Sequence, residues 1–347
     1  MLVLRIDTDD EGVLSCGRSD NWGEVEMRVV VIGGTGHIGS YLVPRLVEAG
    51  HGVTVLARGQ REPYRRHAAW EHVERVTVDR PAEEVAGTFG RRILDLRPDV
   101  VIDAIAFRLL SVQRMVEALR GAVQQYVFVG SIWVHGYSTV VPTSEDQPRR
   151  PFGDYGIQKA AAESYLLEQA RRNRFPATVV HPGHIVGPGW EPINPAGHRD
   201  PKVFEMLARG EELALPNFGL ETLHHVHADD VAQIIAKSMT HWTNAVGQSF
   251  HAVSPAALTL CGYAEAVAGW FGQAANLRFL PFEEWKATVP QESAAMTEDH
   301  IAHSPCCSIA KAQRLLDYQP RYTSLEAIYE SVSWLIDHGV INAPPLC

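Results

Sequence analysis

Three features are scarce or missing in this 347-residue sequence, and each absence excludes a class of protein. Basic residues are in deficit, with 31 Lys and Arg against 41 Asp and Glu and a formal net charge of −10, which argues against non-specific nucleic-acid binding. No apolar run is as long as a membrane span. The five cysteines have no metal-ligand spacing, and their odd number without a secretory signal predicts a reduced, cytoplasmic protein.

The first 26 residues also lack something, namely the basic start and apolar centre of a signal peptide. The segment is acidic and precedes the first strand-like run. We interpret residues 1–26 as a disordered extension, or as translation from too early a start.

A glycine-rich turn follows the first apolar run. Residues 28–32 (RVVVI) are typical of a buried parallel strand, and the next residues read GGTGHIG before a helical apolar pattern begins. Glycines at such positions let the chain turn tightly, approach a pyrophosphate and pack helix on strand, with phosphate at the helix N-terminus. The turn therefore predicts a dinucleotide site made by Gly33, Thr35, Gly36, His37, Ile38 and Gly39.

Strand-like and helical patterns alternate through the first half of the chain. This alternation predicts an α/β fold with a doubly wound parallel (Rossmann) sheet. The expected strands are 28–32, 52–58, 75–79, 99–106, 125–131 and 177–183, with helices at 109–120 and 155–173. From residue 184 the character changes: 186–201 reads as a loop rich in proline and glycine, and 255–340 as a helical lobe with short strands.

Tyr155 and Lys159 lie four residues apart in a helical pattern, with Ser131 upstream. Positions i and i+4 share one face of a helix, and a nearby cation lowers a tyrosine pKa. A phenol tuned in this way can exchange a proton with an alcohol or carbonyl, while a serine hydroxyl holds the same oxygen. These three residues are the predicted catalytic set.

The motifs GGTGHIG, YGIQK and HPGHIVGPG (181–189) resemble the extended short-chain dehydrogenase/reductases, the NAD-dependent epimerase/dehydratase family. The resemblance covers residues 27–340. It implies a Rossmann domain of 27–183 to which 223–252 return, and a smaller, mostly helical substrate domain of 184–222 and 253–340. It also implies a homodimer, in which helices 109–120 and 155–173 pair with their copies.

The resemblance assigns roles to residues. Ser131 and Tyr155 would hold the reacting oxygen, and Lys159 would hold the nicotinamide ribose. Further cofactor-binding positions are Asp79 and Arg80 at the adenine, then Ala104, Ala106, His181 and Gly183. Candidate substrate-binding residues are Trp133, His184, Arg199 and His225.

The choice of nucleotide depends on the end of the second strand. NAD enzymes usually carry an acid there, but this strand ends in Arg58, with Arg61 close behind. An arginine there can pair with a 2′-phosphate. The sequence therefore favours NADP, and NAD remains open.

The sequence departs from the family in two places. Ile132 and Trp133 stand where 4,6-dehydratases of sugar nucleotides have an Asp-Glu pair. Leu223 stands where UDP-sugar enzymes commonly have an arginine that grips diphosphate. A metal site is not predicted, because no close histidine pair recurs with a carboxylate at ligand spacing.

Three functions fit these features. The first is an epimerase or dehydratase that transiently oxidises a sugar, nucleoside or similar polyol. The second is an NADP-dependent ketoreductase. The third is a non-enzymatic nucleotide-binding or RNA-associated protein, against which the intact Ser131, Tyr155 and Lys159 and the acidic charge argue. The partner we expect is a small polar substrate, without nucleic acid or membrane.

Overall fold

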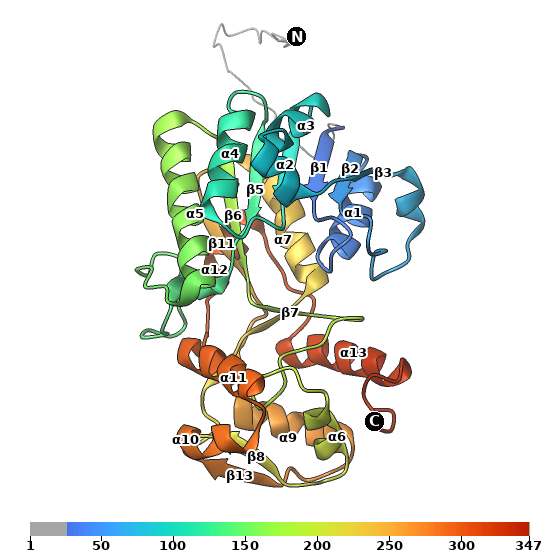
Figure 1. Ribbon diagram of the computed structural model, residues 1–347, viewed down its shortest axis with the longest axis vertical. Coiled ribbons are helices and arrows are strands. Elements are labelled where there is room, and N and C mark those ends of the chain that lie inside the picture. Colours follow the sequence, from blue (N-terminus) through green and yellow to red (C-terminus); the bar gives the residue numbers. More distant parts are fainter. Residues whose placement is uncertain (1–25, 347) are drawn as a thin grey trace, which may run out of the picture.

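Seven parallel strands form one sheet in the larger of two lobes (Figure 1). The computed structural model describes residues 26–346, so the predicted extension lies almost wholly outside the described residues. In spatial order the strands are β11 (Ser249–Ala252), β6 (Ala177–Pro182), β5 (Gln125–Val129), β4 (Val100–Asp103), β1 (Arg28–Ile32), β2 (Gly52–Ala57) and β3 (Glu74–Thr77). The order reverses between β1 and β4, which is where ligands bind in doubly wound sheets. The predicted Rossmann fold is confirmed.

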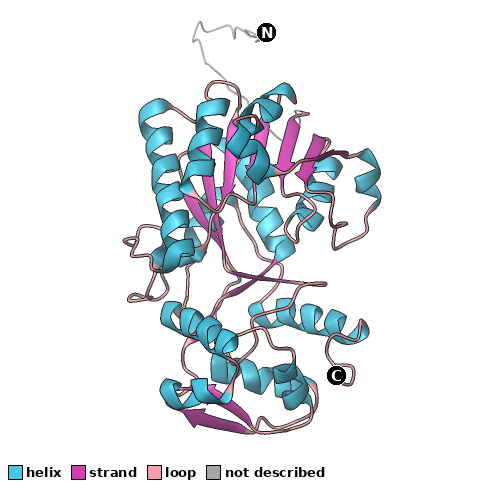
Figure 2. Ribbon diagram, viewed as in Figure 1, coloured by secondary structure: helices cyan, strands magenta, loops and turns pink. Residues whose placement is uncertain are grey.

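Helices cover both faces of the sheet (Figure 2), and the alternation of side chains along each strand explains why. Val29 and Val31 of β1 belong to one core, with α1 (Gly39–Glu48), α7 (Ala228–Thr240) and α12 (Ala310–Leu316). Val30 and Ile32 belong to the other core, with α3 (Phe89–Asp95), α4 (Leu109–Leu119) and α5 (Gly153–Asn173). The central strands β1, β4, β5 and β6 are buried on both sides and therefore mostly apolar, whereas the edge strand β3 is largely exposed and carries Glu74 and Arg75.

The apolar stripe of α4 belongs to this second core. Val112, Val116 and Leu119 are fully buried against the sheet. The stripe therefore gives no support to a helix-bundle dimer. The outward side chains include Leu110 and Ile157, 54% and 49% exposed, and the homodimer remains a prediction.

The smaller lobe is mostly helical and has its own core, which includes Trp285, Tyr263 and Leu223. Two short strand pairs belong to it, β8 (Leu213–Pro216) with β13 (Leu277–Leu280) and β9 (Thr222–Leu223) with β12 (Leu258–Thr259). Its helices are α6 (Lys202–Ala208), α9 (Leu260–Trp270), α10 (Phe282–Trp285), η4 (Lys286–Thr288), α11 (Gln291–His303) and α13 (Ser324–Asp337).

Between the lobes, β7 (His184–Val186) pairs with β10 (His225–His227). The remaining short helices are η2 (Ala68–His72), α2 (Arg80–Ala86), η3 (Ile132–His135) and α8 (Trp242–Ala245).

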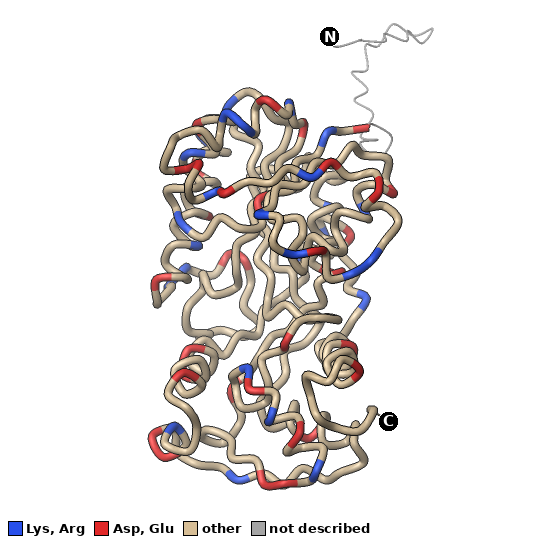
Figure 3. The backbone as a smooth tube through the Cα atoms, turned by 45° about the vertical axis from the view of Figure 1, so that its right-hand side comes forward, with Lys and Arg blue, Asp and Glu red and all other residues tan. Residues whose placement is uncertain are grey.

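Charges of both signs are interspersed over the two lobes (Figure 3). Across residues 26–346, no helix is both long enough and apolar enough to span a bilayer.

Candidate active site

The turn between β1 and α1 has a shape that only glycine permits. Gly33 has φ +85°, and a Cβ there would lie 2.6 Å from Ile105. A Cβ on Gly39 would lie 2.0 Å from the carbonyl oxygen of Gly34, where α1 begins. Backbone is thus left bare at the N-terminus of a helix, which is the cradle that a pyrophosphate requires.

This turn opens onto a cavity of about 590 Å³ at the carboxyl ends of β1, β2 and β4. Of the predicted cofactor residues, nine line it: Gly33, Thr35, Gly36, His37, Ile38, Gly39, Arg58, Ala104 and Lys159. Arg61 lines it as well. Asp79, Arg80, Ala106, His181 and Gly183 do not.

Arg80 serves a different purpose from the predicted adenine contact. Its guanidinium is buried and makes two hydrogen bonds to the carboxylate of Asp103, at 2.7 and 2.9 Å, and a third to Glu84 at 2.6 Å. Burial alone would raise the pKa of Asp103, but Arg80 and the Tyr126 hydroxyl lower it. Asp79 accepts a hydrogen bond from Ala82 N and caps α2. The arginine is therefore part of the structural core.

Three other predicted cofactor residues lie beside the cavity in other roles. The carbonyl of Ala106 accepts a hydrogen bond from Lys159. Gly183 lines the neighbouring cavity. His181 is fully buried behind Ser131, whose backbone N–H donates to Nδ1 of the histidine at 3.0 Å.

The predicted catalytic set is brought together. Lys159 is 2% exposed, and its ammonium donates to the carbonyls of Val129 (2.7 Å) and Ala106 (2.9 Å). Its nitrogen lies 5.8 Å from the centre of the Tyr155 ring. Tyr155 and Ser131 line the same cavity. The Ser131 hydroxyl accepts from Trp133 N at 3.2 Å.

The electrostatics differ from the prediction. Burial lowers the pKa of Lys159 to about 7, against an opposing effect of Asp103. Burial raises the pKa of Tyr155, and the contribution that lowers it comes from the Ser131 side chain. The expectation that Lys159 lowers the tyrosine pKa is therefore wrong for this structure, because the buried lysine has itself lost much of its tendency to carry charge.

A second cavity of about 430 Å³ adjoins the first, and Tyr155, Ile185, Trp190 and Arg199 line both. Three of the predicted substrate residues, Trp133, His184 and Arg199, line this second cavity. The fourth, His225, does not, because it is fully buried with Nε2 3.2 Å from the Ile193 carbonyl.

His184 is the unusual member of this lining. Neither of its ring nitrogens has a hydrogen-bond partner in the described structure. Burial, then the neighbouring His300 and His225, lower its pKa well below the ordinary value, so the ring is neutral. A neutral imidazole offers one donor and one acceptor, which suits substrate hydroxyl groups. Among residues 26–346, no group of three His, Cys, Asp or Glu side chains is placed to hold a metal ion.

An aromatic wall borders the second cavity. Trp133 stacks on His303 of α11, with ring centres 4.1 Å apart, and meets Tyr155 edge-on at 5.9 Å. Such a wall can accept the face of a sugar ring. Sequence reasoning did not identify His300, Met296, Trp190 or Glu191, which also line the cavity. Trp190 and Glu191 lie in the predicted loop 186–201. Met296 and His300 lie in α11, whose ordinary helical sequence pattern gave no sign that it borders a cavity.

Trp190 connects the two cavities physically. Its ring stacks on His37 of the glycine turn, with centres 5.1 Å apart, and meets Tyr64 at 5.8 Å. Ser331 of α13 hydrogen-bonds to its backbone carbonyl. The loop that carries Trp190 thus forms a cover anchored in both lobes.

Comparisons with known proteins agree with this geometry. A model of the "NAD dependent epimerase/dehydratase family" matches residues 29–251. A UDP-glucose 4-epimerase of Mycolicibacterium smegmatis is 28% identical over 61% of this chain and 73% of its own. A 2′-dehydrokanamycin reductase of Streptomyces kanamyceticus is 26% identical over 79% and 75%. The structure of a UDP-glucose 4-epimerase with UDP-glucose from Thermotoga maritima superposes with a TM-score of 0.68 at 20% identity, covering 90% and 99% of the chains.

Proposed function

Because the chain belongs to the NAD-dependent epimerase/dehydratase family, we propose that it transiently oxidises one hydroxyl of a sugar, nucleoside or similar polyol to a ketone. One observation carries the proposal: Tyr155 lines both cavities, and Ser131 lines the second cavity with it. A phenol at that boundary can reach a substrate on one side and a nicotinamide on the other.

The residues of the larger cavity fit a nicotinamide dinucleotide. The bare glycine turn would hold the pyrophosphate. When bound, the nucleotide supplies a hydride acceptor and donor. Arg58 is exposed at the end of β2, with Arg61 nearby, and a 2′-phosphate would pair with them. We therefore propose NADP as the cofactor.

The protein's own residues would handle the proton. Ser131 holds the substrate oxygen, and Tyr155 in its phenolate form takes the hydroxyl proton as the carbon–oxygen bond becomes a carbonyl. Lys159 would bind the ribose beside them. Trp133 and Ile132 replace the acidic pair of the dehydratases, so any later proton transfer uses Tyr155 itself or His184.

The charges of the substrate cavity favour a substrate without diphosphate. Leu223 is fully buried in the core of the smaller lobe, so it leaves no cation at the family's diphosphate position. Arg199 lines both cavities. Glu191 carries a formal charge and lines the substrate cavity but not the cofactor cavity. A carboxylate repels phosphate and attracts an amino group, so the substrate is a neutral or amino-bearing polyol.

A redox-neutral cycle is the proposed reaction, because the Trp190 cover spans both cavities and would retain nucleotide and ketone together. The second candidate is an NADP-dependent ketoreductase, which the similarity to 2′-dehydrokanamycin reductase favours.

Two measurements separate these reactions. The purified protein is unfolded and the released nucleotide identified, because a cycling enzyme keeps its cofactor. The protein is then mixed with NADP⁺ and D-glucose, D-glucosamine, adenosine or UDP-glucose, because a transient oxidation starts from the oxidised nucleotide. Each compound is also supplied in its 3- or 4-keto form, where that is stable, together with NADPH. A rearranged product from the alcohol without net formation of NADPH supports the cycle. Stoichiometric loss of NADPH on the keto form, with no rearrangement of the alcohol, establishes the reductase, and preference for UDP-glucose refutes the charge argument.

Tyr155→Phe tests the catalytic assignment. We expect turnover to fall by about 10²–10⁴, as for other acid/base groups, with nucleotide affinity nearly unchanged because the phenol acts on the substrate oxygen. Retention of most activity would remove Tyr155 from the mechanism. Tyr137→Phe is the matched control, since that tyrosine is 59% exposed and lines neither cavity.

A further inference from the structure

Ser131 is held from behind by a buried histidine. After β5 ends at Val129, the backbone N–H of Gly130 still donates to the strand partner Val180 at 2.7 Å. The next N–H, that of Ser131, donates instead to Nδ1 of the His181 side chain at 3.0 Å. A side chain thus replaces the main-chain ladder at the residue proposed to hold the substrate oxygen.

The approach of His181 requires a glycine at position 130. A Cβ on Gly130 would lie 2.4 Å from Nδ1 and 2.7 Å from Cε1 of the histidine. Nδ1 accepts a hydrogen bond and therefore carries no proton, so the neutral ring carries its proton on Nε2. Nε2 lies 3.0 Å from Oε1 of Glu163, off the line of a good hydrogen bond, so the attraction is mainly electrostatic.

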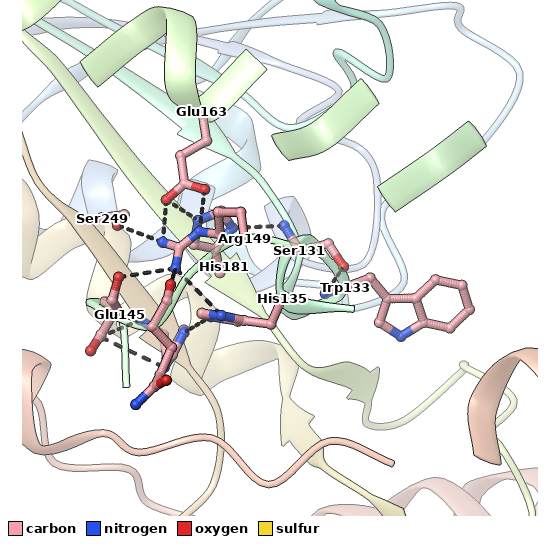
Figure 4. Close-up of polar contacts among 10 residues, drawn as sticks. Ser131, Trp133, His135, Glu145, Arg149, Glu163, His181 and Ser249 are labelled. Atoms are coloured by element: carbon pink, nitrogen blue, oxygen red, sulfur yellow. Dashed lines mark hydrogen bonds and ion pairs between the residues drawn. The ribbon is translucent and has the colours of Figure 1, made fainter. Parts of the chain in front are cut away.

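Glu163 is itself fixed by Arg149, which makes two hydrogen bonds to its carboxylate at 2.6 and 2.8 Å (Figure 4). Burial would raise the pKa of Glu163, but His181 and Arg149 lower it well below the ordinary value. The glutamate is therefore ionised and cannot take the proton from Nε2. This arrangement defines both the orientation and the tautomer of His181.

From this geometry we infer that His181 is a positioning residue, whose Nδ1 places Ser131 by accepting the hydrogen bond of the serine backbone N–H. Without that acceptor the buried N–H would be left unpaired, and Ser131 would lose its support. The inference takes the role of Ser131 from the proposed function, but the hydrogen bond can be tested without it.

The groups that face His181 come from four other elements. Glu163 of α5 faces Nε2, and Arg149 holds Glu163. His135 of η3 and His251 of β11 are neutral rings, because burial lowers the pKa of each. They lie 2.8 Å apart through their Nε2 atoms, and the His181 and His251 ring centres are 6.3 Å apart. Glu145, which accepts from His251 N at 2.9 Å, is the remaining nearby acid. Substitution of His181 alone therefore removes its acceptor and leaves these neighbours in place.

The first experiment uses the full-length protein and needs no substrate. NMR of ¹⁵N-labelled protein follows the Ser131 amide and the tautomer of the His181 ring. We expect the ring proton on Nε2 and a Ser131 amide that exchanges slowly with solvent because it is hydrogen-bonded. His181→Phe should shift this amide and speed its exchange, whereas His181→Asn, which keeps an acceptor, should change it less. His338→Asn, a change at an exposed histidine, should leave the amide unchanged.

The second experiment measures placement through function. His181→Phe removes the acceptor at similar size, and we expect kcat to fall by about 10²-fold, as when an oxyanion-stabilising donor is displaced, with nucleotide affinity and Tm nearly unchanged. His181→Asn, which keeps an acceptor, should retain kcat. A Ser131 amide indifferent to His181→Phe would overturn the inference. So would an unchanged kcat in His181→Phe. If the parent protein shows no turnover, that result contradicts the proposed function and leaves the NMR test of the hydrogen bond unaffected.

Discussion

Lys159→Met should stabilise the protein while it abolishes turnover. The lysine is 2% exposed, and its ammonium is held by two neutral carbonyls rather than by a carboxylate in direct contact. Burial lowers its pKa from 10.5 to about 7. A residue kept for chemistry at this energetic cost is expected to trade stability for activity.

The magnitude follows from that pKa. At about 1.4 kcal/mol per pKa unit, the drop corresponds to about 5 kcal/mol of destabilisation while the lysine is charged. Methionine removes this cost but leaves the carbonyls of Ala106 and Val129 without their donor, at about 1–3 kcal/mol each. We therefore expect a net gain in the free energy of unfolding of about 1–2 kcal/mol at pH 6.

The sign of the pH dependence is fixed as well. Because the folded pKa lies below the unfolded value, the unfolded chain binds one more proton than the folded protein between pH 7 and 10.5. The stability of the parent protein should rise through that window on account of this group. The advantage of Lys159→Met should shrink accordingly, by about 2–3 kcal/mol between pH 7 and pH 9.

Urea unfolding at pH 6, 7 and 9 measures this difference, with Lys202→Met as the control for loss of an exposed lysine. The reasoning is refuted if Lys159→Met is less stable than the parent at pH 6 by more than about 1 kcal/mol, a typical error of such extrapolations. It is equally refuted if the difference between the two proteins does not change with pH.

Three further predictions follow from other parts of the structure. Arg58→Ala should weaken NADP more than NAD by about 1.5–3 kcal/mol, the value of a hydrogen bond to a charged group; a titration in which the parent prefers NAD would oppose this. Asp103→Asn should cost about 3–5 kcal/mol, because it removes the carboxylate that makes two of the hydrogen bonds of the buried Arg80 and leaves only Glu84 as its charged partner, whereas the double variant Arg80→Met/Asp103→Leu should be near neutral in urea unfolding. The protein should be a homodimer by light scattering at micromolar concentration, and a monomer there would exclude the family's helix-bundle dimer.

Local sequence patterns were sufficient to define the fold. The apolar run 28–32 followed by GGTGHIG specified β1, its turn and α1, because the required glycines are a property of the local backbone. Ser131, Tyr155 and Lys159 were identified from the spacing and the family resemblance. The cofactor-turn residues also line the cavity as predicted.

Residues whose role depends on distant partners were assigned less well. Arg80 follows a strand at the expected cofactor edge, yet its guanidinium turns inward because Asp103, 23 residues away, is a buried carboxylate that needs a partner. The role of His181 also depends on distant partners. The Ser131 amide and Glu163 lie beside the histidine only because the folded chain brings them together.

The sequence by itself thus determined the sheet and the glycine turn, since each depends on residues close together along the chain, and the family resemblance added Ser131, Tyr155 and Lys159 as the predicted catalytic set. Tertiary structure decided which polar side chains face the cavities and which support them from behind. It also decided the electrostatics: a Tyr-x-x-x-Lys spacing implies a charged lysine beside a tyrosine, but burial removes the water that stabilises that charge and lowers the pKa of Lys159 to about 7. Desolvation is a property of the packed molecule, and no spacing along the chain encodes it.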